Sequence, residues 1–73
     1  MKLRDWLAAG AMTPDEMAKR IDVTGEAVRR YCSGARMPKP EIARRIYEVT
    51  GGEVTVQDLH EQRLAFLGAV EAV

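Results

Sequence analysis

The chain has 73 residues, with 11 Lys and Arg against 11 Asp and Glu, and 47% of its residues are hydrophobic. A chain this short has room for one small core but normally none for an elaborate active site as well, so we expect a binding module and not an enzyme. The zero net charge argues against a polybasic coat protein, although it does not say where the charges sit.

Apolar spacing predicts a short first helix over about residues 2–9. Leu3, Trp6 and Leu7 fall at positions i, i+3 and i+4, which share one face of a helix. Gly10 is a typical helix end. This helix therefore has one face to bury.

A capping box predicts where the second helix begins. Thr13 can accept from the backbone N–H of Glu16, whose side chain can reach back, and Pro14 suits the first helical position. We expect this helix to run from Pro14 to Ile21. Its apolar face is formed by Met17, Ala18 and Ile21.

The third predicted helix follows after only a few residues. Thr24 is a good N-cap, and the helix should span residues 25–32. Gly34 suits the left-handed conformation that often closes a helix. The inward face is expected to consist of Ala27, Val28 and Tyr31.

Two more helices complete the predicted set. Pro40 can occupy the first position of a fourth helix, which Gly51 and Gly52 end. Its buried stripe is expected to consist of Ile42, Ala43, Ile46 and Val49. Thr55 begins a fifth helix, with Asp58 favourable to its dipole. In this helix we expect Val56, Leu59 and Leu64 to pack inward. With no alternating strand pattern, the fold class is all-α, a compact bundle of about five short helices.

Residues 13–38 resemble the helix-turn-helix of the Cro/phage-repressor (XRE-like) DNA-binding family. The family's apolar, small and terminating positions are matched by Met17, Ala18, Ile21, Val28, Tyr31, Gly34 and Pro38. The stretch from residue 42 to residue 59 is similar to the fourth and fifth helices of small Cro-like regulators. Two positions depart from the family: Asp22 stands where a turn glycine is usual, and Pro14 stands where a DNA-contacting Gln is frequent. Asp tolerates a left-handed backbone, so the turn should survive.

The resemblance implies a lambda-repressor-like DNA-binding fold over residues 1–60, with the helix-turn-helix at about residues 14–33. The implied function is that of a sequence-specific, double-stranded-DNA-binding transcriptional regulator, most simply a repressor that occupies an operator. The helix at residues 25–32 would lie in the major groove. We expect no ligand to be needed, since the length leaves no room for an effector domain.

Helical spacing also defines a candidate DNA-reading face. If Ala27, Val28 and Tyr31 face the core, the opposite side carries Gly25, Glu26, Arg29, Arg30 and Ser33. On DNA, Arg29 or Arg30 could bind guanine O6 and N7 in bidentate fashion, and Glu26 could accept from cytosine N4. Gly25 would let the backbone approach the duplex closely.

Four further residues are candidates for contacts with the sugar-phosphate backbone. Thr13 and Thr24 stand at helix N-termini, whose amides favour phosphate. Arg36 and Lys39 follow the reading helix in the loop. These four residues would position the protein without reading sequence.

The charges are segregated along the chain. Residues 19–45 carry eight cations against three anions, whereas residues 51–73 carry one cation against four anions. A basic region of this kind is expected of a phosphate-binding protein, with the acidic end facing away.

Other polar and aromatic residues have simpler interpretations. We expect Arg44 and Arg45 to pair with glutamates of their own helix, and Trp6 and Tyr31 to lie in the core. A lone Cys32 cannot form an internal disulfide, nor complete a four-ligand zinc site with the single His60. We therefore expect an inert cysteine, a surface histidine and no metal or other cofactor.

The remaining predictions concern location and partners. No apolar run approaches the ~20 residues of a membrane span, so we expect no membrane association and a cytoplasmic, nucleoid-associated protein. The apolar tail at residues 61–73 either folds Phe66, Leu67 and Val70 onto the core or forms a dimer contact. We favour a homodimer that reads a palindromic operator, because one domain reads only a half-site. The alternative function is a protein-interaction module on a helix-turn-helix scaffold, antitoxin-like or polymerase-binding, that docks through this tail.

Overall fold

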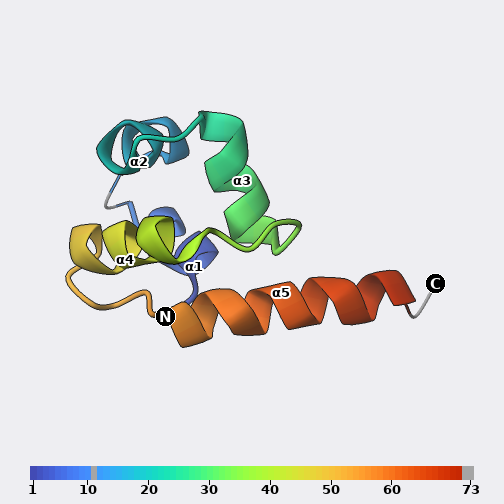
Figure 1. Ribbon diagram of the computed structural model, residues 1–73. Coiled ribbons are helices and arrows are strands. Elements are labelled where there is room, and N and C mark those ends of the chain that lie inside the picture. Colours follow the sequence, from blue (N-terminus) through green and yellow to red (C-terminus); the bar gives the residue numbers. More distant parts are fainter. Residues whose placement is uncertain (11, 72–73) are drawn as a thin grey trace.

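The computed structural model describes residues 1–10 and 12–71, with side chains described as far as residue 69. Within these ranges every regular element is a helix, which confirms the all-α prediction (Figure 1). The elements are α1 (Leu3–Ala8), α2 (Pro14–Ile21), α3 (Gly25–Ser33), α4 (Pro40–Val49) and α5 (Val56–Glu71). The bounds of the first three helices lie within one residue of those predicted.

Local side-chain caps begin the two helices of the helix-turn-helix. Glu16 N–H donates to Thr13 Oγ1 at 3.1 Å and Thr13 N–H donates back to Glu16 Oε1 at 3.4 Å, so the predicted capping box is present. At α3, Ala27 N–H donates to Thr24 Oγ1 at 3.1 Å. Each cap satisfies amide groups that the first helical turn leaves without partners.

A left-handed residue makes the turn between α2 and α3. Asp22 has φ 59° and ψ 51°, as expected for the residue that replaces a turn glycine. Val23 N–H donates to Ala18 O at 3.0 Å and closes the turn. At the other end of α3, Gly34 has φ 87°, the predicted left-handed cap.

The core lies where α1, α2, α3 and α4 meet the first turns of α5. Leu3, Met17, Ile21, Val28 and Ile46 have no exposed surface. Trp6 and Tyr31 also belong to this core, as predicted. The buried stripe of α4 consists of Ile42, Ala43 and Ile46, and Val49 is only partly buried against it.

The predicted inward face of α5 was wrong at two of three positions. Leu59 is buried, but Val56 and Leu64 are 52% and 54% exposed. Leu59 and Gln62, three residues apart, define the buried side of α5, and Leu64 lies about 140° around the helix from Leu59. Val54, in the loop before α5, fills the core in place of Val56.

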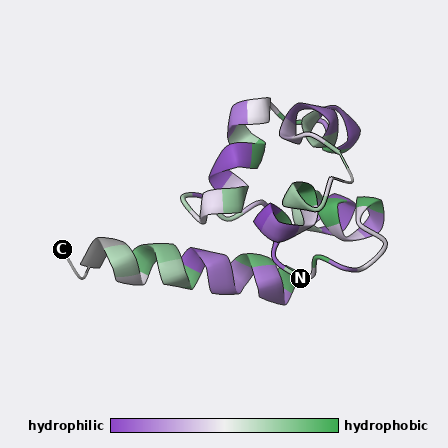
Figure 2. Cartoon of the chain, turned by 180° about the vertical axis from the view of Figure 1, so that it is seen from behind, coloured by the Kyte–Doolittle hydropathy of each residue, from purple (hydrophilic) through white to green (hydrophobic). Residues whose placement is uncertain are grey.

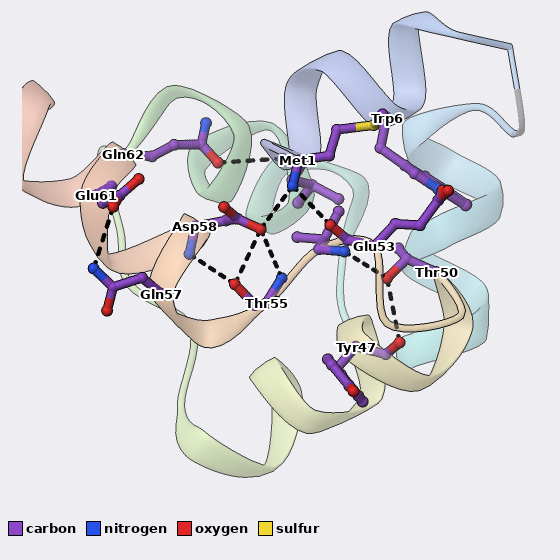
Figure 3. Close-up of polar contacts among 12 residues, drawn as sticks. Met1, Trp6, Tyr47, Thr50, Glu53, Thr55, Gln57, Asp58, Glu61 and Gln62 are labelled. Atoms are coloured by element: carbon purple, nitrogen blue, oxygen red, sulfur yellow. Dashed lines mark hydrogen bonds and ion pairs between the residues drawn. The ribbon is translucent and has the colours of Figure 1, made fainter.

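The start of α5 is held by polar contacts to the N-terminus of the chain, drawn in Figure 3. Asp58 Oδ2 accepts from the Met1 amino group at 2.9 Å and from Thr55 N–H at 2.9 Å, while Asp58 N–H donates to Thr55 Oγ1 at 3.1 Å. The hydrogen bonds that the carboxyl accepts, from Thr55 N–H first and from the Met1 amino group next, lower the pKa of Asp58. Nearby, Trp6 Nε1 donates to Glu53 Oε2 at 2.7 Å.

One uninterrupted helix, α5, crosses the predicted boundary at residue 60, and its C-terminal part projects beyond the other helices (Figure 1). This part is mostly apolar (Figure 2). Phe66 is half-buried and Leu67 is 38% exposed, whereas the side chain of Val70 lies outside the described residues. Among the helices described, none combines the length and the apolar character needed to cross a membrane.

Candidate nucleic-acid interface

The outward face of α3 presents the predicted reading residues together. Ala27, Val28 and Tyr31 are buried, and this packing fixes the rotation of α3 on the core. The opposite side exposes Glu26, Arg29, Arg30 and Ser33, with Gly25 half-buried beside them. The structure therefore places these five candidate residues on one surface of α3.

Both arginines of this surface have a carboxylate partner. Arg30 Nη2 donates to Glu26 Oε1 at 2.6 Å, one turn away in α3. Arg29 Nη2 donates to Asp15 Oδ1 at 3.4 Å, and Asp15 belongs to α2. The contact of Asp15 could not be predicted from the sequence, because fourteen residues separate Asp15 from Arg29 and no local spacing connects the two.

Ser33 lies at the end of the same surface. Its hydroxyl donates to Arg30 O at 3.1 Å and accepts from Ala35 N–H at 3.2 Å. Ser33 thus joins the last turn of α3 to the loop that follows.

The two threonines, Thr13 and Thr24, differ in whether an acceptor within the described residues already takes the hydroxyl proton. Thr13 Oγ1 lies 3.2 Å from Glu16 Oε1 and donates to it, as well as capping α2. Thr24 Oγ1 accepts from Ala27 N–H, and within the described residues no acceptor takes its proton. A hydroxyl both donates and accepts, so Thr24 is the better placed of the two to donate to a phosphate.

Arg36 and Lys39 lie beside the N-terminal end of α3. Together with Thr24 they line a cavity of about 480 Å³ whose walls include Tyr31 and Met37. Both cations are exposed. The loop after α3 therefore shares this cavity with the capping residue of α3, and the anion Glu41 also lines it.

A further cation lies on the other flank of α3. Arg4 of α1 lines a cavity of about 430 Å³ together with Pro14, Arg29 and Ser33. Its exposed position on α1 gave no sequence signal that connected it with α3. The structure places Arg4 beside Arg29 and Ser33, with Asp5 Oδ1 3.9 Å from Arg4 Nε.

Of the two ion pairs predicted within α4, one is present and the other is not. Arg44 Nε donates to Glu48 Oε1 at 3.1 Å, the intrahelical pair expected. Arg45 was predicted to pair in the same way and does not: its Nη1 donates to Ile21 O at 3.1 Å. The last carbonyls of α2 have no partner inside the helix, and Arg45 satisfies one of them.

Cys32 lies half-buried in the last turn of α3. Burial raises the pKa of the Cys32 thiol, and the charge of Arg4 opposes this effect only in part. The thiol is the unreactive form of cysteine, so this environment fits the expected inert residue.

Comparisons with known proteins bear on this geometry. A family model described as helix-turn-helix, of the XRE/Cro-like type, matches residues 3–57. This match spans α1 to α4 and the first residues of α5. Neither the curated proteins nor the solved structures that were compared gave a match.

Proposed function

The chain belongs to the XRE/Cro-like helix-turn-helix family of DNA-binding regulators, and we propose that it reads a double-stranded operator through the major groove with α3. The exposed surface of α3 carries this proposal, because it presents two arginines and a glutamate on a helix held by the core. Arg29 and Arg30 would read guanine, and Glu26 would read cytosine. Arg36, Lys39 and Thr24 would bind phosphates beside them.

The simplest mechanism is repression by occupancy. A regulator that holds an operator through a folded surface needs no chemistry beyond binding, and the proposed contacts are all hydrogen bonds and charges. Specificity would rest on few arginines, since the chain has no net charge. Affinity for unrelated DNA should therefore be modest and should fall steeply with salt.

We assign the exposed apolar side of α5 to a second copy of the chain. Leu64 and Leu67 are exposed in the C-terminal half of α5, and this end of the helix is mostly apolar (Figure 2). A self-complementary apolar patch suits a two-fold dimer, and two copies would read the two halves of a palindrome.

The test is titration of genomic DNA fragments at several salt concentrations, followed by selection of the bound sequences. The variants Arg29→Ala and Arg30→Ala should each weaken binding to the selected operator by about tenfold or more. Arg44→Ala is the matched control, since it removes an exposed arginine of α4 that is paired with Glu48. If both α3 variants keep wild-type affinity and salt dependence, α3 is not the reading helix. Pull-down of another protein without DNA binding would favour the interaction-module function instead.

A further inference from the structure

The carboxylate of Asp15 crosses from α2 to the beginning of α3. Its Oδ1 lies 3.4 Å from Arg29 Nη2, at the same point where a Cβ on Gly25 would collide with it. Gly25 thus leaves the space through which Asp15 reaches Arg29. The three residues form one contact across the helix-turn-helix, which no local pattern in either helix requires.

This contact constrains Arg29 from a second helix. The Glu26–Arg30 pair joins two residues of α3, so both partners move with α3. Asp15 instead belongs to α2, so it holds the guanidinium relative to the whole helix-turn-helix. The side chains of Asp15 and Arg29 are 70% and 62% exposed, and an ion pair this exposed adds little to the stability of the fold. Its effect is therefore on the position of Arg29.

The geometry leaves Arg29 able to read a base. A guanidinium has five N–H donors in a rigid plane, and Asp15 takes one of those on Nη2. Two of the remaining donors are enough for guanine O6 and N7. Restricting a long side chain before binding reduces the conformational entropy that is lost when the bidentate contact forms.

The same carboxylate opposes binding to DNA in general. It places a negative charge on the surface that is to meet phosphates, next to one of the cations that attract them. Discrimination is a difference between two affinities, and it increases when the unwanted complex is weakened. A fixed anion beside Arg29 weakens all complexes with DNA, and only a complex in which the oriented Arg29 binds guanine regains the lost affinity.

We propose that Asp15 is a specificity-determining residue of the DNA-reading surface, which orients Arg29 toward a base and weakens nonspecific binding. This inference rests on the proposed function and extends it to a residue outside α3. It assigns Asp15 a positioning role that acts through Arg29.

The test compares Asp15→Asn, which keeps the shape of the side chain and removes its charge, with the wild type. The measured quantity is the ratio between affinity for the selected operator and affinity for unrelated DNA, at two or more salt concentrations. Asp15→Asn should bind unrelated DNA more tightly and lower this ratio by about two- to fivefold. Glu61→Gln is the charge-matched control, because Glu61 is exposed on α5 and its partner among the described residues is the neutral Gln57. Its ratio should stay at the wild-type value.

A second comparison isolates the action through Arg29. In an Arg29→Ala background, Asp15→Asn should no longer change the selectivity for the guanine that Arg29 reads. Thermal unfolding of each variant shows that the domain is folded. An unchanged ratio in Asp15→Asn, or an equal change with and without Arg29, overturns the inference while wild-type DNA binding stands. A wild type that binds no DNA fragment at low salt overturns the proposed function itself, and the inference with it.

Discussion

The side-chain amide of Gln62, in α5, donates to the backbone carbonyl of Cys32 in the last turn of α3. Its own carbonyl oxygen accepts from Leu3 N–H at 3.3 Å, so one side chain that is 6% exposed joins three helices. Beside it, Arg63 Nη1 donates to Gly34 O and Ala35 O at 3.0 and 2.8 Å. The C-terminal end of the proposed reading helix is therefore held by α5.

Gln62→Ala should destabilise the domain by about 1–3 kcal/mol, because it leaves Leu3 N–H and Cys32 O without partners in a buried place. Urea unfolding followed by circular dichroism measures the change. Gln57→Ala, an exposed glutamine of the same helix, is the control and should change stability by less than about 0.5 kcal/mol. Equal effects of the two substitutions would contradict the role assigned to Gln62.

Arg45→Ala should cost about 1 kcal/mol of stability, since it removes the donor to Ile21 O at the end of α2. Arg44→Ala removes a neighbouring charge that forms an exposed ion pair with Glu48, and should cost about 0.5 kcal/mol or less. Thermal unfolding of the two variants side by side tests the difference. If Arg44→Ala lowers the stability more than Arg45→Ala does, the hydrogen bond from Arg45 to Ile21 O does not stabilise α2 significantly.

Thr13→Ala and Thr24→Ala should each lower stability by about 1 kcal/mol, because each removes an N-cap. Only Thr24→Ala should also weaken DNA binding beyond the loss of folded protein, since the Thr24 hydroxyl proton is available for a phosphate. DNA titration at a temperature where both variants are fully folded separates the two effects. Thr24→Ser, which keeps the hydroxyl, should restore both properties.

Stability should depend on Asp58 in acid. The pKa of Asp58 is lower in the folded chain than in the unfolded chain, so ionised Asp58 favours folding. This contribution is complete above the unfolded pKa and is lost as the pH falls through the folded pKa, below about pH 4. Asp58→Asn should be less stable than wild type at pH 7, and this gap between their free energies of unfolding should close as the pH falls below about 4. A gap independent of pH would show that the Asp58 charge is not its source.

Leu64→Gln combined with Leu67→Gln should convert the proposed dimer to a folded monomer, because both side chains are exposed in the single chain. Sedimentation at several protein concentrations measures the association. Val56→Gln is the control: Val56 has similar exposure but lies at the opposite end of α5, and it should leave association unchanged. A wild type that stays monomeric well above the DNA-binding concentration removes the dimer from the proposal.

The sequence by itself determined the features that depend on neighbouring residues. Thr13 with Glu16 and the left-handed Asp22 are local signals, since caps and turns are made by groups a few residues apart. The exposed side of α3 could be predicted from the helical repeat, because only one rotation of the helix about its axis buries both Val28 and Tyr31. These signals were sufficient for the all-α fold, the helix-turn-helix and the composition of the candidate reading surface.

Only the tertiary structure decided which distant groups meet. In α5 the apolar Leu64 is exposed and the polar Gln62 is buried, because Gln62 satisfies backbone groups of α1 and α3 that no local pattern reveals. Arg45 joins α2, and not its own helix, for the same reason. The Asp15–Arg29 contact exists because α2 packs across α3, which places the first turn of α2 beside Arg29. The helical repeat and the caps depend on residues within one helix. These contacts depend instead on how the helices pack, and that packing is decided by all core residues together.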